Sequence, residues 1–401
     1  MIAREGYVGH GQAIPRGLQD TGQNGSLQKA SIMAAVIVLG VGERLSAVGN
    51  MMVMERDWVP TLASTTSTPS LHVLNAAMRR IDLVCKLVAP LFVSALTLAL
   101  RSIKLTAVII AGMNAASVAV EWVAAHRVWK ANARLRTPKL APALGEGTAS
   151  SNDGALREKF RHWGSGMAFF FSSDVCIPSL SLALLYFSVL SFSASMITYL
   201  LAVNFALSTI TIARTCSTLV EVSATAVMPF GVKFMESRHQ QQQRRPESDA
   251  PDRELSPAAV QRMGLWGLWI QLLCLLPVTH AFFSLSPASA PSSLQAVQLF
   301  AFLALSRMGL WTYDLAVQTL VQTRVPPNRR GEFSGVEVGF VSACELAQWV
   351  ATAVWNKPEE FRYLGAAGSG VVALAVAAYT TWMWRQRGHL VHWEKVTGCK
   401  C

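Results

Sequence analysis

The sequence predicts an all-α, polytopic membrane protein with about nine membrane-spanning helices. Apolar residues make up 52% of the 401 residues and charged residues only 15%, whereas a soluble domain carries about a quarter charged residues. The mean hydropathy is +0.34. The apolar residues come in long blocks of the length that a helix needs to cross a bilayer. Because these blocks lack the alternation of a transmembrane strand, we expect helices in each of them.

The apolar blocks define the expected spans, with three before a long polar stretch and six after it. They lie at about 31–54, 83–100, 105–124, 177–203, 207–228, 265–285, 294–321, 336–354 and 364–384. The predicted organisation is a flexible tail (1–28), a partial N-terminal lobe of three spans (29–124), a cytoplasmic linker (125–154), a C-terminal lobe of six spans (155–385) and a cytoplasmic tail (386–401).

The polar stretch between the two lobes combines a linker with an amphipathic segment. Residues 130–154 are rich in Arg, Lys, Pro, Ala and Gly, a composition typical of a disordered linker. Residues 156–171 then interleave cations with aromatic side chains, namely Arg157, Lys159 and Arg161 with Phe160, Trp163 and Phe169. This mixture predicts an amphipathic helix at the membrane interface that leads into the C-terminal lobe.

The charge distribution predicts the orientation in the membrane. Residues 124–161, 233–262 and 324–330 and the tail are basic, whereas 281–295 holds no charge. Basic loops stay in the cytoplasm, so the C-terminus is expected there. The formal net charge of +11 therefore reflects membrane topology, and we do not expect a nucleic-acid partner.

Ionisable residues inside the apolar blocks are candidates for function, because a charge in hydrocarbon is costly. They are Glu43, Arg44, Lys86, Glu121, Arg214, Glu221, Arg307, Asp314 and Glu345. The alternative interpretation is structural, with charges paired between helices or reaching the headgroups. We favour a cation-binding cavity role for Glu121 and Asp314, which have Asn114 and Tyr313 as polar neighbours.

A second group of charged residues lies at the predicted cytoplasmic ends of spans. It comprises Arg56, Asp57, Asn75, Arg79, Arg80, Asp82, Arg330 and Gly331. Opposite charges at one mouth of a carrier can make and break ion pairs as two lobes rock. Simple anchoring of cations in the cytoplasm would explain Arg79 and Arg80 but not Asp57 and Asp82. We therefore interpret this group as a cytoplasmic gate.

The sequence lacks the common catalytic and metal-binding motifs. The sequence contains no GxSxG, Walker A, HExxH or CxxC motif, and its seven cysteines do not form a disulfide framework. His389, His392, Cys399 and Cys401 are possible soft ligands, but a mobile tail is the simpler interpretation. We expect neither an enzyme nor a resident cofactor.

Several strings in the sequence closely resemble the ferroportin family, solute carrier family 40. They are ERDWVP (55–60), LNAAMRRIDLVCKLVAP (74–90), AGMNAASVAVEW (111–122), LALLYFSVLSFSASMITYLL (182–201), SRMGLWTYDLAVQTLVQ (306–322) and RRGEFSGVE (329–337). The resemblance covers most of residues 40–385 and is closest to the fungal and plant branches. The GLW-x-YDL and RRID…AP strings are its most specific parts.

The resemblance implies a fold, an activity and a set of site residues. The fold would be a major-facilitator-type bundle of two six-helix lobes, working as a monomer in the plasma membrane or an organellar membrane such as the vacuole's. The substrate would be ferrous iron, and other divalent metals in some cases, exported from the cytosol by alternating access. Asn114 and Glu121 match the family's N-lobe cation site. The gate of the family falls on Asp57, Asn75, Arg79, Asp82, Arg330 and Gly331.

The sequence also departs from the family pattern. The first three family helices have no counterpart, so we expect either a truncated or incompletely predicted gene product, which we favour, or a shortened homologue. The direct C-lobe metal ligands are replaced by Ala194 and Gln348, which are poorer ligands. Two alternative functions stay open, namely a major-facilitator carrier of an organic solute and a fragment that does not transport.

Overall fold

In the computed structural model, all regular secondary structure of the described residues is helical. The described residues are 17–64, 71–137, 152–188, 190, 192–243, 257–285, 291–355 and 357–387. Within them no strand is present, which confirms the all-α class. The chain divides into two compact units, Met1–Met54 and Glu55–Cys401, and each is described by itself.

The first unit consists of the long helix α1 (Gly17–Met52). The helix begins inside the segment 1–28 that we predicted as a flexible tail, because no proline interrupts the sequence after Pro15. Its apolar side chains are exposed, for example Val38 and Leu39 at 70% and 72%. Exposed aliphatic residues on a long helix are expected where lipid is the solvent.

The second unit begins at Glu55, inside a π-helical segment whose first two residues belong to the first unit, and continues with further N-terminal helices. These elements are η1 (Val53–Trp58, the π-helical segment), α2 (Val59–Ala63), α3 (Leu71–Leu100), α4 (Ile103–Ala131) and α5 (Ala133–Arg136). α3 and α4 pack together and are joined by a tight turn in which Arg101 has a φ of 50°. Ser102 caps α4 by accepting a hydrogen bond from the Leu105 amide at 3.4 Å. α4 and α5 thus occupy residues 125–136 of the predicted linker 125–154, and residues 138–151 lie outside the described part of the chain.

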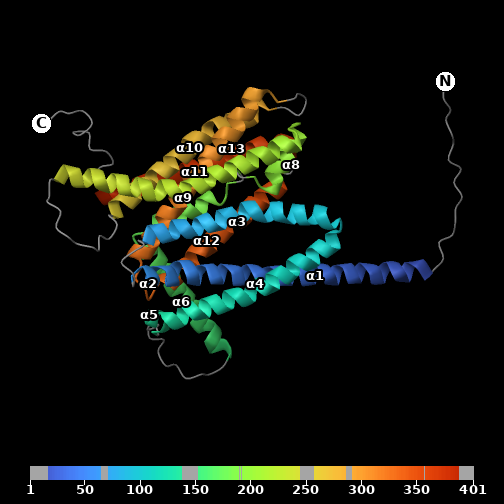
Figure 1. The fold of residues 1–401 in the computed structure, drawn as a ribbon, viewed down its shortest axis with the longest axis horizontal. Coiled ribbons are helices and arrows are strands. Elements are labelled where there is room, and N and C mark those ends of the chain that lie inside the picture. Colours follow the sequence, from blue (N-terminus) through green and yellow to red (C-terminus); the bar gives the residue numbers. More distant parts are fainter. Residues whose placement is uncertain are drawn as a thin grey trace. The chain divides into compact units, whose positions relative to one another are not determined.

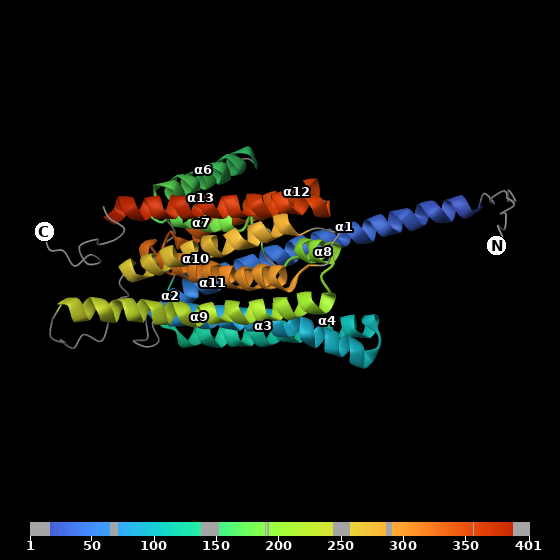
Figure 2. The ribbon, with the colours of Figure 1, turned by 90° about the horizontal axis from the view of Figure 1, so that it is seen from above.

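The remaining helices of the second unit, drawn in Figure 1, carry its hydrophobic core. They are α6 (Asn152–Ser172), α7 (Cys176–Leu185), α8 (Ala194–Ala202), α9 (Leu207–Gln243), α10 (Pro257–Ser284), α11 (Ser293–Arg324), α12 (Arg330–Val354), η2 (Pro358–Glu360) and α13 (Phe361–Arg387). α11 packs against both α9 and α10, while α13 packs against α10 and α7 and α12 packs against α6 and α7 (Figure 2). α3 contacts both α9 and α11, so these two helices join the N-terminal helices of this unit to the core.

The predicted single span 177–203 is interrupted, which corrects the sequence-based boundary. α7 ends at Leu185 and α8 begins at Ala194, and the last part of α6 meets α7 at a bend of 102°. The intervening stretch is rich in serine, whose hydroxyl competes for backbone hydrogen bonds. The Ser188 hydroxyl accepts from the Leu190 amide at 3.3 Å, which replaces a helical hydrogen bond there.

The helices confirm a multi-pass membrane protein. Among the described residues, seven helices are long and apolar enough to cross a membrane, or eight if the bent α6–α7 pair counts as one span. The predicted span 336–354 forms α12, which is long enough but contains Glu337, Glu345 and Gln348 and is not among the seven. The structure thus supports fewer clear spans than the nine expected, because the block 336–354 contains polar side chains and the helix is interrupted between α7 and α8 within the block 177–203.

Two glycines set the distance between α10 and α11. A Cβ added to Gly309 would lie 2.5 Å from the Gly267 carbonyl oxygen and 2.8 Å from the Gln271 amide nitrogen. A Cβ on Gly267 would in turn lie 2.8 Å from the Gly309 carbonyl oxygen. Such close backbone approach requires glycine on both helices, as in other small-residue contacts between membrane helices.

We predict that Gly309→Ala will lower the thermal unfolding midpoint of the detergent-solubilised protein by several degrees. The added methyl group meets backbone atoms that cannot move aside, and overpacking of this kind costs about 1–3 kcal/mol. Gly370→Ala is the matched control, because a Cβ at Gly370 meets nothing within 4 Å. Equal midpoints for the two variants would contradict the close contact.

Candidate functional site

Two polar stripes, one on α3 and one on α11, form the candidate site. On α3 the stripe consists of Asn75, Arg79, Asp82 and Lys86, and on α11 of Arg307, Trp311, Asp314, Gln318 and Gln322. Spacings of three and four residues place each set on one helix face. The contacts run in opposite directions along the two helices: Asn75 meets Gln322, Arg79 meets Asp314, and Lys86 lies near Trp311. The two helices are therefore antiparallel, with their polar faces toward each other.

A buried ion pair lies at the centre of this contact. The Nη2 atom of Arg79 donates to Oδ2 of Asp314 at 2.5 Å, and the two side chains are only 9% and 8% exposed. The Arg79 guanidinium also lies 4.9 Å from the centre of the Trp311 ring. A cation held by a carboxylate and an aromatic face is well compensated, whereas either partner alone would leave a buried charge.

An amide pair continues the contact toward the N-terminal end of α3. Asn75 donates to Oε1 of Gln322 at 2.5 Å and accepts from Nε2 of Gln322 at 3.2 Å. The same Nε2 atom donates to the Glu55 carbonyl at 2.5 Å. Both side chains are buried. The reciprocal amide bonds therefore fix the register of α3 against α11.

Arg330 lies at the same end of the contact and donates hydrogen bonds to backbone carbonyls. Its Nη2 atom donates to the Gln322 carbonyl at 2.7 Å and to the Val325 carbonyl at 3.3 Å, and its Nη1 atom to the Arg56 carbonyl at 3.4 Å. Burial, together with the nearby Arg56 charge, lowers the pKa of Arg330. An arginine nevertheless stays protonated at neutral pH. Arg330 thus ties α11, α12 and η1 together as a fixed cation.

A second ion pair joins η1 to α12 beside Arg330. Nη2 of Arg56 donates to Oε2 of Glu337 at 2.7 Å, with the two side chains 13% and 2% exposed. Glu337 and Gln322 were not among the predicted gate residues. A sequence signal for Gln322 exists, because it continues the polar stripe of α11 one turn beyond Gln318. No comparable signal marks Glu337, whose partner is 281 residues away.

A third ion pair lies on the far side of Trp311. Nε of Arg307 is 3.2 Å from Oε1 of Glu221 on α9, and Nε1 of Trp311 donates to Oε2 of the same carboxylate at 3.0 Å. Arg214 and Glu221, and likewise Arg307 and Asp314, are seven residues apart on one helix face, a spacing that allows each pair to line one cavity. In the structure the ion pairs of Glu221, Arg307 and Asp314 instead connect different helices.

The other predicted gate residues lie close to this network. Asp82 is 3.6 Å from Nη1 of Arg79 and 2.8 Å from Nζ of Lys86, both measured to Oδ2. Asp57 lies in η1, where its carbonyl accepts from the Thr61 hydroxyl at 2.7 Å. Gly331 is the second residue of α12 and is exposed. The gate residues predicted from the sequence therefore gather at one end of the second unit.

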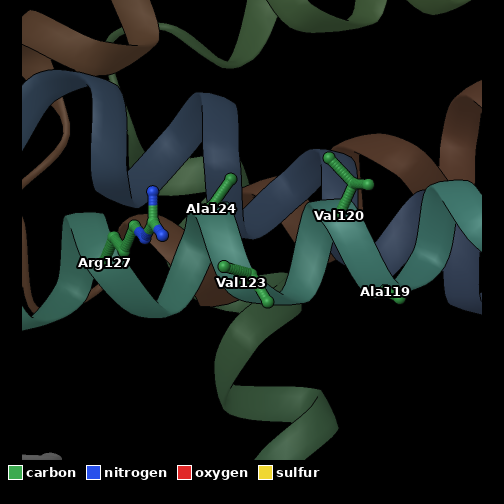
Figure 3. A pocket seen from close by; sticks show the side chains of 5 residues that line it. All are labelled: Ala119, Val120, Val123, Ala124 and Arg127. Atoms are coloured by element: carbon green, nitrogen blue, oxygen red, sulfur yellow. The ribbon is translucent and has the colours of Figure 1, made fainter.

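The predicted cavity residues are less closely grouped. Asn114 and Glu121 lie on α4, and both are exposed, whereas Asp314 is buried on α11 in its pair with Arg79. A shallow depression on α4 is lined by Ala119, Val120, Val123, Ala124 and Arg127 (Figure 3). It includes neither Asn114 nor Glu121 and offers no anionic ligand.

No preformed metal cluster is evident in the described part of the chain. Among those residues, no group of three or more His, Cys, Asp or Glu side chains could hold a metal ion. Ala194 is the first residue of α8, and Gln348 is buried on α12. The tail with His389, His392, Cys399 and Cys401 lies outside the described residues.

Comparisons with known proteins agree with this architecture. The sequence model of the family described as Ferroportin1 (FPN1) matches residues 18–236 and 256–372. Solute carrier family 40 member 1 of Oryza sativa subsp. japonica is 28% identical over 376 residues, covering 91% of this chain and 72% of the relative. Ferroportin of Homo sapiens is 23% identical over 395 residues, covering 81% and 67%.

Solved structures give the same fold. The chain is similar to the crystal structure of a bacterial homologue of iron transporter ferroportin in outward-facing state with soaked iron, with a TM-score of 0.69 and 21% identity. The match covers 92% of this chain and 76% of that one. A second structure of a bacterial homologue in outward-facing state gives a TM-score of 0.67 at 21% identity, covering 88% of this chain and 73% of that one.

We predict that Asp314→Asn will destabilise the protein by about 3–5 kcal/mol, because Arg79 then stays buried without its counter-ion. The double variant Arg79→Met with Asp314→Leu should recover most of that loss, since it removes both charges. The measurement is the unfolding midpoint in detergent, with Arg385→Met on the exposed end of α13 as control. A double variant no more stable than Asp314→Asn would argue against the ion pair.

Proposed function

This chain belongs to the ferroportin family, and from that membership we propose that it exports ferrous iron from the cytosol by alternating access. It is a multi-pass membrane transporter and not an enzyme. The family assignment rests on a match over residues 18–236 and 256–372. One structure that this chain resembles is that of a bacterial homologue of the iron transporter ferroportin with soaked iron, which supports iron as the substrate class.

The observation that carries the proposed mechanism is the buried charged contact between α3 and the C-terminal helices. It lies at the end where α11 finishes and α12 begins, next to the basic segment 324–330. Basic segments face the cytoplasm. The contact therefore corresponds to a conformation closed toward the cytosol, in which iron can leave on the opposite side.

We propose that this contact is the cytoplasmic gate of the carrier. The predicted gate residues Asp57, Asn75, Arg79, Asp82, Arg330 and Gly331 supply part of it. Gln322 completes the amide pair with Asn75, and Arg56 with Glu337 adds an ion pair. Opening toward the cytosol would separate α3 from α11, so these contacts would break and re-form in each cycle.

Asn114, Glu121 and Asp314 remain our proposed cation-contacting residues. Asp314 is engaged by Arg79 in the cytosol-closed conformation, so its carboxylate becomes available to a metal ion only when the gate opens. The amide of Gln348 and the methyl group of Ala194 are poor ligands for ferrous iron compared with imidazole or thiolate. We therefore place the cation near the carboxylates and not at these two positions.

We further propose that one chain in a lipid bilayer forms one transport pathway. The contacts of the gate all occur within the second unit of a single chain, and none requires a second copy. Exposed apolar residues on α3 and α4, such as Leu98 at 78% and Val120 at 69%, suit contact with lipid.

The proposed function predicts uptake of radiolabelled Fe²⁺, kept reduced with ascorbate, into proteoliposomes that contain the purified chain. Uptake should saturate with Fe²⁺ concentration and exceed that of protein-free liposomes. Competition by divalent metals but not by organic cations would distinguish it from an organic-solute carrier. Metal uptake no higher than in empty liposomes would rule the proposal out for this chain.

The gate predicts a specific transport defect in Arg330→Ala. This change removes the guanidinium that joins three backbone carbonyls, so the cytosol-closed conformation is destabilised. We expect the maximal uptake rate to fall about tenfold or more, since losing charge-assisted hydrogen bonds costs about 1.5–3 kcal/mol. Arg385→Ala should keep the wild-type rate. Wild-type transport by a well-folded Arg330→Ala protein would exclude this residue from the gate.

A further inference from the structure

Lys86 occupies an unusual position for a charged residue. It lies near the middle of the span Val73–Leu100, roughly 20 Å of helix from either end at about 1.5 Å per residue. A lysine stem cannot reach the headgroups from that depth. Its ammonium group must therefore be stabilised inside the protein or in a polar cavity.

The contacts of Lys86 show where the side chain is directed. Nζ of Lys86 donates to Oδ2 of Asp82 at 2.8 Å, one turn earlier on α3. It also lies 5.8 Å from the centre of the Trp311 ring on α11. Lys86 thus faces α11, on the same polar face as the gate. Its side chain is 59% exposed, so open space adjoins it.

Three cations lie over the Trp311 ring, and each is paired with a carboxylate that is held in a different way. Asp314 is 8% exposed and paired with Arg79, and Glu221 is 14% exposed and bonded to both Arg307 and Trp311. Asp82 is 33% exposed, and its shortest ion pair is with a flexible lysine. Arginine holds a carboxylate through a rigid fork, whereas lysine is a mobile point charge. Asp82 is therefore the carboxylate of this group that an incoming cation can reach most easily.

We propose that Lys86 is a tethered cation that competes with the transported divalent cation for the Asp82 carboxylate. The inference rests on the proposed transport function and assigns a positioning role to a residue outside the predicted site. A metal ion that approaches Asp82 must displace the ammonium group of Lys86. When the metal ion leaves, Lys86 returns and restores the neutral pair.

This competition has a clear consequence for a carrier. A carboxylate in a low-dielectric cavity would bind a divalent cation strongly, and a strongly bound ion leaves slowly. Transport requires binding that is favourable enough for entry and weak enough for release. An internal lysine weakens the bound state and supplies a replacement charge at the moment of release. Lys86 therefore sets how tightly the pathway holds its ion.

The test compares Lys86→Met and Lys86→Arg with the parent chain in Fe²⁺ uptake by proteoliposomes. For Lys86→Met we expect the half-saturating Fe²⁺ concentration to fall about tenfold, the scale for removing one like charge a few ångströms away, and the maximal rate to fall as well. Lys86→Arg should stay within about threefold of the parent in affinity, because it keeps the charge. Lys104→Met, at an exposed lysine on α4, is the matched control and should match the parent in both parameters.

Repeating the Lys86→Met substitution in an Asp82→Asn chain distinguishes competition at Asp82 from a general effect of removing a positive charge. In an Asp82→Asn chain, Lys86→Met should no longer change the half-saturating concentration, because the carboxylate for which both cations compete is gone. If Lys86→Met tightens Fe²⁺ equally in both backgrounds, the proposed competition is wrong. An unchanged affinity in Lys86→Met with the Asp82 carboxylate intact would likewise overturn it.

Equilibrium dialysis of radiolabelled Fe²⁺ against the detergent-solubilised variants measures Fe²⁺ binding without transport. It therefore tests the role of Lys86 separately from the transport proposal. Tighter binding by Lys86→Met supports the role of Lys86 even if no variant transports, in which case only the transport proposal fails. Transport by the parent chain, combined with equal Fe²⁺ binding by parent and Lys86→Met, would leave the transport proposal standing and refute the role of Lys86. Size-exclusion chromatography of each variant confirms that the chain is folded.

Discussion

The ion pair between Arg79 and Asp314 is the interaction on which the arrangement of the second unit depends. A buried guanidinium must have a counter-ion, and its counter-ion lies on α11, far away in the sequence. α3 is therefore held against α11 in one register, which brings Asn75 to Gln322 and Lys86 to Trp311. In an apolar environment this polar match is more selective than apolar packing, because lipid competes equally for apolar faces.

The same network is suited to switching because it is not fully satisfied. Among the described residues, Nε of Arg79, Nε of Arg330, Nη1 of Arg56 and Oε1 of Glu337 are buried and have no hydrogen-bond partner. A partly satisfied polar network is less stable than a complete one. This contact, which we propose as the cytoplasmic gate, is held by a few strong bonds but lacks the full set of hydrogen bonds that would make it permanent.

The C-terminal helices provide the rigid half of this design. Gly267 and Gly309 bring α10 and α11 into backbone contact, and the core continues through α13 and α7. Ser292 and Gln295 form a capping box at the start of α11, which satisfies its first amides. α11 therefore presents Arg307, Trp311 and Asp314 from a fixed position, while in the proposed mechanism the partners on α3 move away.

The sequence by itself determined the features that depend on local pattern. Apolar block length and loop charge predict helices and their orientation, and the charge pattern groups Asn75, Arg79 and Asp82 at the cytoplasmic end of a span. The family resemblance assigned these residues and Arg330 to one gate. The tertiary structure decided the partners: Asp314 for Arg79, Glu221 for Arg307, and Glu337 for Arg56. It also placed the break between α7 and α8. The physical reason is that periodicity tells which face of a helix is polar, whereas the identity of the opposing helix follows only from how all the helices pack.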